Sequence, residues 1–155
     1  MKTLIAAGLL IGFGVIANFL ATILLNIAGL PGALMAGKPG ERSKSRFVFG
    51  SLVSAAGQAY VYLAYVAFVV NWTRVAAERQ DTMAWVLWPL AFLAVMVPVL
   101  LNLLHARLEA QELAFGNPQV EAMHITFLAA LLGFALFVFV PAVASAGWGW
   151  VPYVN

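Results

Sequence analysis

The segment TLIAAGLLIGFGVIANFLATILLNIAGL, residues 3–30, contains no charged side chain. An α-helix needs about 20 consecutive apolar residues to cross the hydrocarbon core of a bilayer, and this segment is longer than that. Lys2 precedes it, as in a secretory signal peptide, but the apolar part of a signal peptide is only about 7–15 residues long. We therefore predict that residues 4–30 form a transmembrane helix that is retained.

Three further apolar stretches have a spanning length, namely residues 47–72, 83–104 and 123–146. Their apolar runs are continuous rather than alternating, which favours helices over the strands of a membrane barrel. The sequence thus predicts an all-α integral membrane protein, a four-transmembrane-helix bundle with short loops. We expect residues 1–155 to form one transmembrane domain.

Helix-breaking and charged residues separate the predicted spans. Pro31 and Gly32 are expected to end the first span, and the charged run 74–81 separates the second from the third. Asn117 is a suitable N-cap for the last helix, with Pro118 at its first position. Two prolines inside the third span, at positions 89 and 98, each remove a backbone donor and predict a kink.

The composition excludes several classes of protein. Of 155 residues, 64% are hydrophobic and 9% are charged, whereas soluble domains carry about 25% charged residues. The absence of cysteine excludes disulfides, thiolate metal sites and cysteine nucleophiles. No basic run alternates with aromatic residues, so nucleic acid is not an expected partner. The expected partners are the lipid bilayer and other membrane subunits or further copies of the chain.

The distribution of basic residues predicts the orientation, because cytoplasmic loops are enriched in Lys and Arg. Residues 31–46 and 105–122 carry five of them: Lys38, Arg42, Lys44, Arg46 and Arg107. The opposite side carries three: Lys2, Arg74 and Arg79. We therefore predict a multi-pass protein of the inner membrane, with loops 31–46 and 105–122 cytoplasmic and both termini external.

Small and polar residues at a spacing near four form a stripe along the first span: Gly14, Asn18, Thr22 and Asn26. Gln58 is an amide inside the second span. Such residues mark contacts between membrane helices, since lipid cannot satisfy their hydrogen bonds. We expect the stripe and Gln58 to face other helices. The alternative is a polar path or ligand pocket lined by the three amides.

The connection between the third and fourth spans contains the residues with most chemical potential. His105, Glu109 and Glu112 lie at positions i, i+4 and i+7 of a helical pattern, and Glu121 and His124 form a Glu-x-x-His spacing. If the chain reverses near residues 116–117, these side chains meet. Imidazole and carboxylate ligands from facing helices build metal sites in helix bundles.

A second interpretation of this connection needs no metal. The acidic residues Glu109, Glu112 and Glu121 lie on the same side as the basic loop and could form salt bridges with Arg42, Lys44 or Arg46. This interpretation is favoured, because the residues lie at the membrane edge, where charges are expected. The sequence requires no cofactor.

Three functions remain open. The favoured one is a non-catalytic accessory or structural subunit of a larger inner-membrane complex. The second is a small membrane enzyme or redox protein that uses the His/Glu connection. The third is an oligomeric small-molecule transporter or channel. The sequence contains no Gly-rich phosphate loop and no G-x-S-x-G motif, and Asp81 lies on the opposite side from both histidines, which excludes a Ser-His-Asp triad. A protein that is not an enzyme is therefore favoured.

Overall fold

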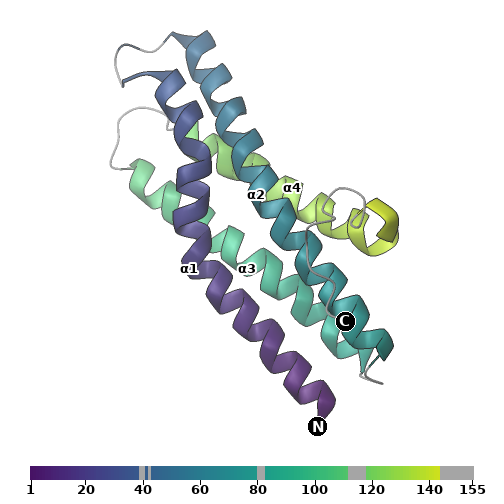
Figure 1. The fold of residues 1–155 in the computed structure, drawn as a ribbon. Coiled ribbons are helices and arrows are strands. Elements are labelled where there is room, and N and C mark those ends of the chain that lie inside the picture. Colours follow the sequence, from purple (N-terminus) through teal and green to yellow (C-terminus); the bar gives the residue numbers. More distant parts are fainter. Residues whose placement is uncertain (39–40, 42, 80–82, 112–117, 144–155) are drawn as a thin grey trace.

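The computed structural model describes residues 1–38, 41, 43–79, 83–111 and 118–143. These residues form four long α-helices: α1 (Lys2–Ala36), α2 (Lys44–Arg79), α3 (Ala84–Gln111) and α4 (Pro118–Phe139). No strand occurs among the described residues. Figure 1 shows the four helices gathered in one bundle, which confirms the predicted all-α architecture.

Helices α1 and α3 run in the same direction and stay in register. Three pairs of contacting residues, each 80 positions apart, fix this register: Thr3 with Met83, Gly14 with Ala94, and Thr22 with Asn102. Helix α2 runs in the opposite direction. Ser54 donates to the Gly29 carbonyl (2.7 Å), and Gln58, one turn later on α2, donates to the Leu25 carbonyl, one turn earlier on α1 (3.2 Å).

The backbones of α1 and α2 approach closely near the ends that the first loop joins. A Cβ atom added at Gly50 would lie 2.5 Å from the Gly32 carbonyl oxygen and 2.8 Å from the Ala36 side chain. One at Gly57 would collide with the Ala28 carbonyl. Only glycine permits this approach, and close backbone contact of this kind is a main source of attraction between membrane helices.

Pro31 lies inside α1, so the helix continues past the predicted end of the first span to Ala36. Pro31 has no N–H and deprives the Ile27 carbonyl of its helical donor. Both residues are exposed, so this loss does not fall in the core. Gly32 is buried against α2, and this packing holds the helix together beyond the proline. The helix ends at Gly37, whose φ of 79° favours glycine.

Helix α2 also extends beyond its predicted span. The charged run was expected to separate two spans, but the helix continues through Arg74 and Glu78 to Arg79. Charged side chains at the edge of a bilayer can reach water, so they end the span without ending the helix.

Helix α4 begins at Pro118, which confirms the predicted first position and lies before the predicted span of 123–146. Asn117, the predicted N-cap, lies outside the described residues. The helix ends at Phe139, because Val140 precedes Pro141 and the residue before a proline is pushed out of the α-helical region. The predicted span of 123–146 thus extends beyond the end of α4, and its residues 144–146 lie outside the described residues.

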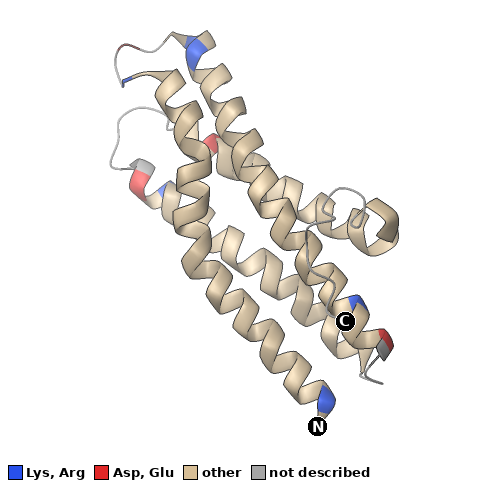
Figure 2. Ribbon diagram, in the orientation of Figure 1, with Lys and Arg blue, Asp and Glu red and all other residues tan. Residues whose placement is uncertain are grey.

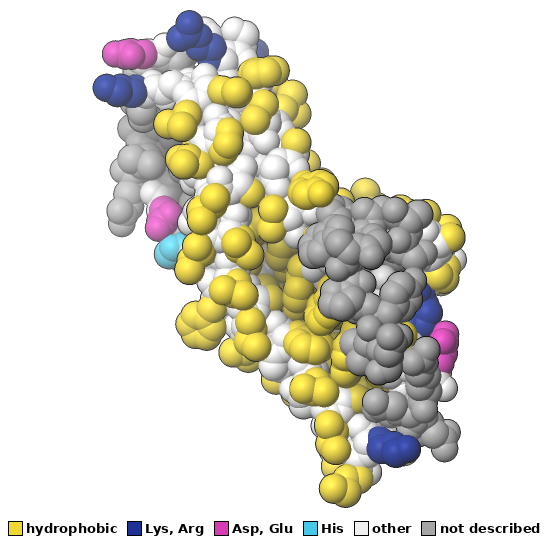
Figure 3. Space-filling view, in the orientation of Figure 1, with side chains coloured by type: hydrophobic (Ala, Val, Ile, Leu, Met, Phe, Trp, Pro, Cys, Tyr) yellow, Lys and Arg dark blue, Asp and Glu magenta, His cyan; other side chains and the backbone are white. Residues whose placement is uncertain are grey.

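All four helices are long and apolar enough to cross a bilayer. Figure 2 shows the described Lys, Arg, Asp and Glu residues at the two ends of the bundle. Hydrophobic side chains cover much of the face between them, as Figure 3 shows. The chain is thus a small multi-pass membrane protein. Its orientation stays a prediction.

Candidate functional site

Two tyrosines of α2 bind the backbone of α3 where Pro98 interrupts its hydrogen bonding. Pro98 has no N–H, so the Ala94 carbonyl, four residues earlier, loses its helical donor. The Tyr65 hydroxyl donates to this carbonyl over 3.0 Å. Tyr62, one turn earlier, donates to the neighbouring Val95 carbonyl over 2.5 Å. The two hydroxyls therefore join α2 to the proline-containing turn of α3.

The same device recurs at the end of α4. Pro141 deprives the Phe137 carbonyl of its helical donor, and Arg74 of α2 donates to that carbonyl over 2.7 Å. Asn71 accepts a second hydrogen bond from the Arg74 guanidinium at 3.2 Å, which fixes its direction. Helix α2 thus provides side-chain donors for a carbonyl beside Pro98 of α3 and for a carbonyl in the last turn of α4, just before Pro141.

The predicted polar stripe is divided between different surroundings. Gly14 packs on Ala94, where an added Cβ atom would lie 3.2 Å from the Ala94 Cα atom. Thr22 donates to the Asn102 carboxamide oxygen over 2.9 Å, while Asn102 donates to the Pro98 carbonyl over 2.8 Å. These two members of the stripe therefore contact α3.

Three amides of the predicted stripe and second span differ in their environment. Gln58 is buried; besides its hydrogen bond to α1 it accepts one from Thr126 of α4 (3.4 Å), so it joins three helices. Asn18 is half-buried at the edge of the α1–α3 contact. Asn26 is exposed. Residues of α1 and α3 that are 80 positions apart lie side by side, an alignment called here the register of 80. Asn26 therefore lies level with the charged end of α3 beside Arg107, where water and headgroups can solvate it.

Sequence reasoning missed Asn102, Tyr62 and Tyr65. Asn102 is an amide inside the predicted third span, so the argument that singled out Gln58 applies to it equally. The two tyrosines had a subtler signal: a proline in a membrane helix leaves a carbonyl that needs a donor, and hydroxyls on a neighbouring helix can supply it.

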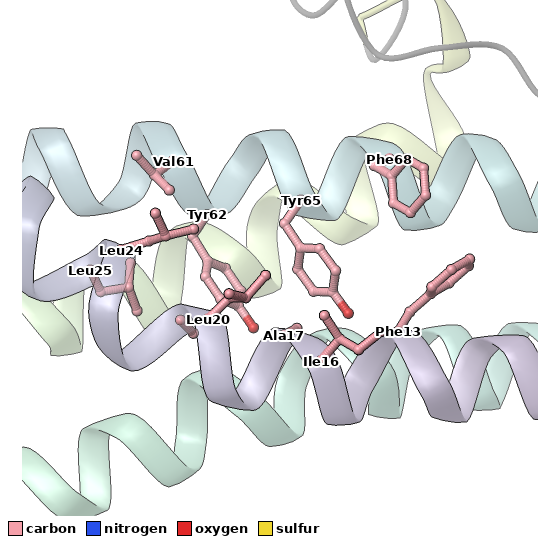
Figure 4. Close-up of a pocket in the computed structure, with 11 residues that line it drawn as sticks. Phe13, Ile16, Ala17, Leu20, Leu24, Leu25, Val61, Tyr62, Tyr65 and Phe68 are labelled. Atoms are coloured by element: carbon pink, nitrogen blue, oxygen red, sulfur yellow. The ribbon is translucent and has the colours of Figure 1, made fainter.

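Two outward-opening grooves flank α1. The α1–α2 groove has a volume of about 290 Å³ and is apolar except for the tyrosine hydroxyls; Figure 4 shows both rings extending from α2 toward α1. The α1–α3 groove, of about 320 Å³, is lined by hydrophobic side chains and by Asn18, and its lining includes Ile11, Val15, Leu93 and Val97. Both grooves are thus lined almost entirely by apolar side chains.

The His/Glu connection forms local pairs in the described structure. His105 Nε2 lies 3.1 Å from Glu109 Oε1, one turn along α3, and both side chains are largely exposed. His124 Nε2 accepts from Arg107 Nε over 3.1 Å. Because arginine only donates, the proton of His124 lies on Nδ1, which donates to the Val120 carbonyl (2.8 Å). Both ring nitrogens of His124 are thus occupied.

The predicted metal site stays a prediction. Among the described parts of the chain, no three His, Asp or Glu side chains are close enough to hold a metal ion. Glu112 lies outside the described residues, Glu121 is exposed, and His124 would have to leave Arg107 to bind a metal.

The predicted salt bridges to the first loop also stay a prediction. Arg42 lies outside the described residues. Within the ranges that the structure describes, the acidic residue paired in a salt bridge is Glu109, and its partner is on its own helix.

The fold and these contacts define a multi-pass α-helical membrane protein whose polar side chains join helices. Comparisons with models of protein families, with curated proteins and with solved structures find no match to this chain.

Proposed function

We propose that this protein is a non-catalytic accessory subunit of a larger complex in the inner membrane. The observation that carries the proposal is the one-sided packing of α1. In an apolar stretch of 18 residues of α1 only 22% is buried inside the protein, whereas the corresponding share for α2 is 50%. Most of the exposed side chains of α1 are large and apolar, and they are available to neighbouring subunits as well as to lipid.

The use of the polar side chains supports a structural role. Gln58, Tyr62, Tyr65 and Arg74 each hold one helix to another, mostly through backbone carbonyls. In the described residues no buried side-chain nitrogen or oxygen lacks a hydrogen-bond partner. The polar groups of the interior are therefore committed to the bundle, which favours a structural role over the two alternatives.

The experiment is purification in a mild detergent, followed by mass spectrometry of co-purifying chains and elemental analysis. Ile23→Trp adds bulk to the exposed face of α1, and Leu132→Trp is the matched control on the exposed face of α4. We expect another membrane protein in stoichiometric amount, reduced by Ile23→Trp and retained by Leu132→Trp.

Two results would contradict the proposal. One is the absence of any stoichiometric partner from native membranes. The other is a stoichiometric metal that His124→Ala abolishes, which would favour the alternative of a membrane enzyme or redox protein.

A further inference from the structure

Asn18 lies near the middle of the membrane-spanning part of the bundle. Phe13 packs edge-to-face on Trp72 with ring centroids 5.2 Å apart, so Arg74 of the antiparallel α2 lies level with about residue 11 of α1. The register of 80 places Arg107 level with residue 27. At 1.5 Å per residue, Asn18 is about 10 Å and about 14 Å from these two charged levels.

The Asn18 side chain has no hydrogen-bond partner within the described ranges. Thr22 bonds the backbone carbonyl of Asn18 and the side chain of Asn102, leaving the Asn18 carboxamide unused. The amides of Gln58 and Asn102, by contrast, both donate and accept. Asn18 instead lines the α1–α3 groove, whose other lining residues are apolar.

An unsatisfied carboxamide at this depth is costly, because the hydrocarbon core offers it no partner. Polar side chains inside a membrane accordingly face protein or a water-filled cavity. The α1–α3 groove opens sideways between exposed hydrophobic residues, among them Ile11, Val15 and Val97. A second polypeptide that covers this groove can supply the missing partner.

We propose that the partner is a second copy of this chain, bound as a symmetric dimer across the α1–α3 groove with the two Asn18 side chains hydrogen-bonded to each other. Copies inserted in the same orientation place the same residue at the same depth. A carboxamide contains both a donor and an acceptor, so it is complementary to itself across a two-fold axis. Any other partner would need a polar group matched to Asn18 in depth.

The absence of cysteine from the chain allows a direct test. A disulfide requires Cα atoms within about 7 Å, so only residues near the two-fold axis can be joined to their own copies. Val15 is one turn before Asn18 on the same face of α1, whereas Ile23 points to a different side of the helix and is similarly exposed. Val15→Cys is the test variant and Ile23→Cys is the matched control.

We expect oxidation in native membranes to convert Val15→Cys to a covalent dimer and to leave Ile23→Cys monomeric. Adding Asn18→Leu should weaken dimerisation of the Val15→Cys protein about 3- to 20-fold, the range expected for hydrogen bonding between membrane helices, and Asn18→Gln should restore it. Co-capture of two differently tagged copies gives a second measurement that does not depend on cysteine.

Equal cross-linking of the two cysteine variants, or none of Val15→Cys together with no co-capture, would overturn the proposal. An unchanged dimer in the Asn18→Leu variant would show that the carboxamide does not contribute. This inference does not rest on the accessory role proposed above. Loss of a foreign partner leaves the Val15 cross-link intact, and loss of the cross-link leaves a foreign partner detectable by mass spectrometry.

Discussion

Replacing Tyr65 with phenylalanine removes the hydroxyl that serves the Ala94 carbonyl and leaves the ring in place. Ala94 is 6% exposed, so water does not replace the lost donor, and Pro98 cannot supply one. Hydrogen bonds between membrane helices contribute about 0.6 kcal/mol on average and up to about 1.7 kcal/mol. A buried group left without any partner costs about 1–3 kcal/mol. We therefore expect Tyr65→Phe to lower the free energy of unfolding by about 1–2 kcal/mol.

The cause of this loss can be isolated with a double-mutant cycle. Pro98→Ala returns an N–H to position 98, and this N–H can bond the Ala94 carbonyl within α3. In the Pro98→Ala background, Tyr65→Phe should therefore cost about 1 kcal/mol less than in the natural sequence. The effect of Pro98→Ala itself cancels, because the cycle compares the same change in two backgrounds.

The assay is reversible unfolding in mixed micelles, followed by tryptophan fluorescence, with Tyr62→Phe as the control. Tyr62 donates to the Val95 carbonyl, and Val99, four residues further on, retains its own N–H. Tyr62→Phe should therefore show little coupling to Pro98→Ala. An equal cost of Tyr65→Phe in both backgrounds would refute the argument that the hydroxyl replaces the donor lost at Pro98.

Three further predictions concern other contacts. Gly32→Ala should destabilise the protein by about 1–3 kcal/mol, because the added Cβ atom would collide with α2. At Gly12 the added Cβ atom meets open space, so Gly12→Ala should leave the stability of the protein unchanged or raise it. Thermal unfolding in detergent compares the two variants. Arg74→Met should cost about 1.5–3 kcal/mol by removing the charged donor to the Phe137 carbonyl, and no change in the unfolding midpoint would contradict this. Reporter fusions should place residues 31–46 on the cytoplasmic side and the C-terminus outside, and a cytoplasmic C-terminus would invert the predicted orientation.

The four helices could be predicted from the sequence because their apolar runs have a spanning length that water-soluble helices rarely need. Their ends could not, because a run of hydropathy locates the hydrocarbon layer and not the last hydrogen bond. Pro31 illustrates the difference. It is a helix breaker by local rules, but the contact of Gly32 with α2 holds the helix past it.

The sequence identified residues that need hydrogen-bond partners on other helices, but not which residues supply those partners. Spacing identified Thr22, and a polar amide inside an apolar span identified Gln58, as residues that need partners, and both have them. Which helix supplies each partner depends on the parallel register of α1 and α3, and no local pattern contains that register. For the same reason, facing positions on the connection between α3 and α4 suggested a ligand set, whereas His124 bonds Arg107, a residue outside that set.

The register of 80 also has a consequence for biosynthesis. Thr22 and Gly14 reach the membrane as part of the first helix, but their partners on α3 are synthesised 80 residues later. At about 5–20 residues per second, this interval is about 4–16 s. During that time the α3-facing side of α1 has only lipid, α2 or the insertion machinery to contact. The close packing of α1 on α2 needs only the first half of the chain, so these contacts can form before α3 is synthesised.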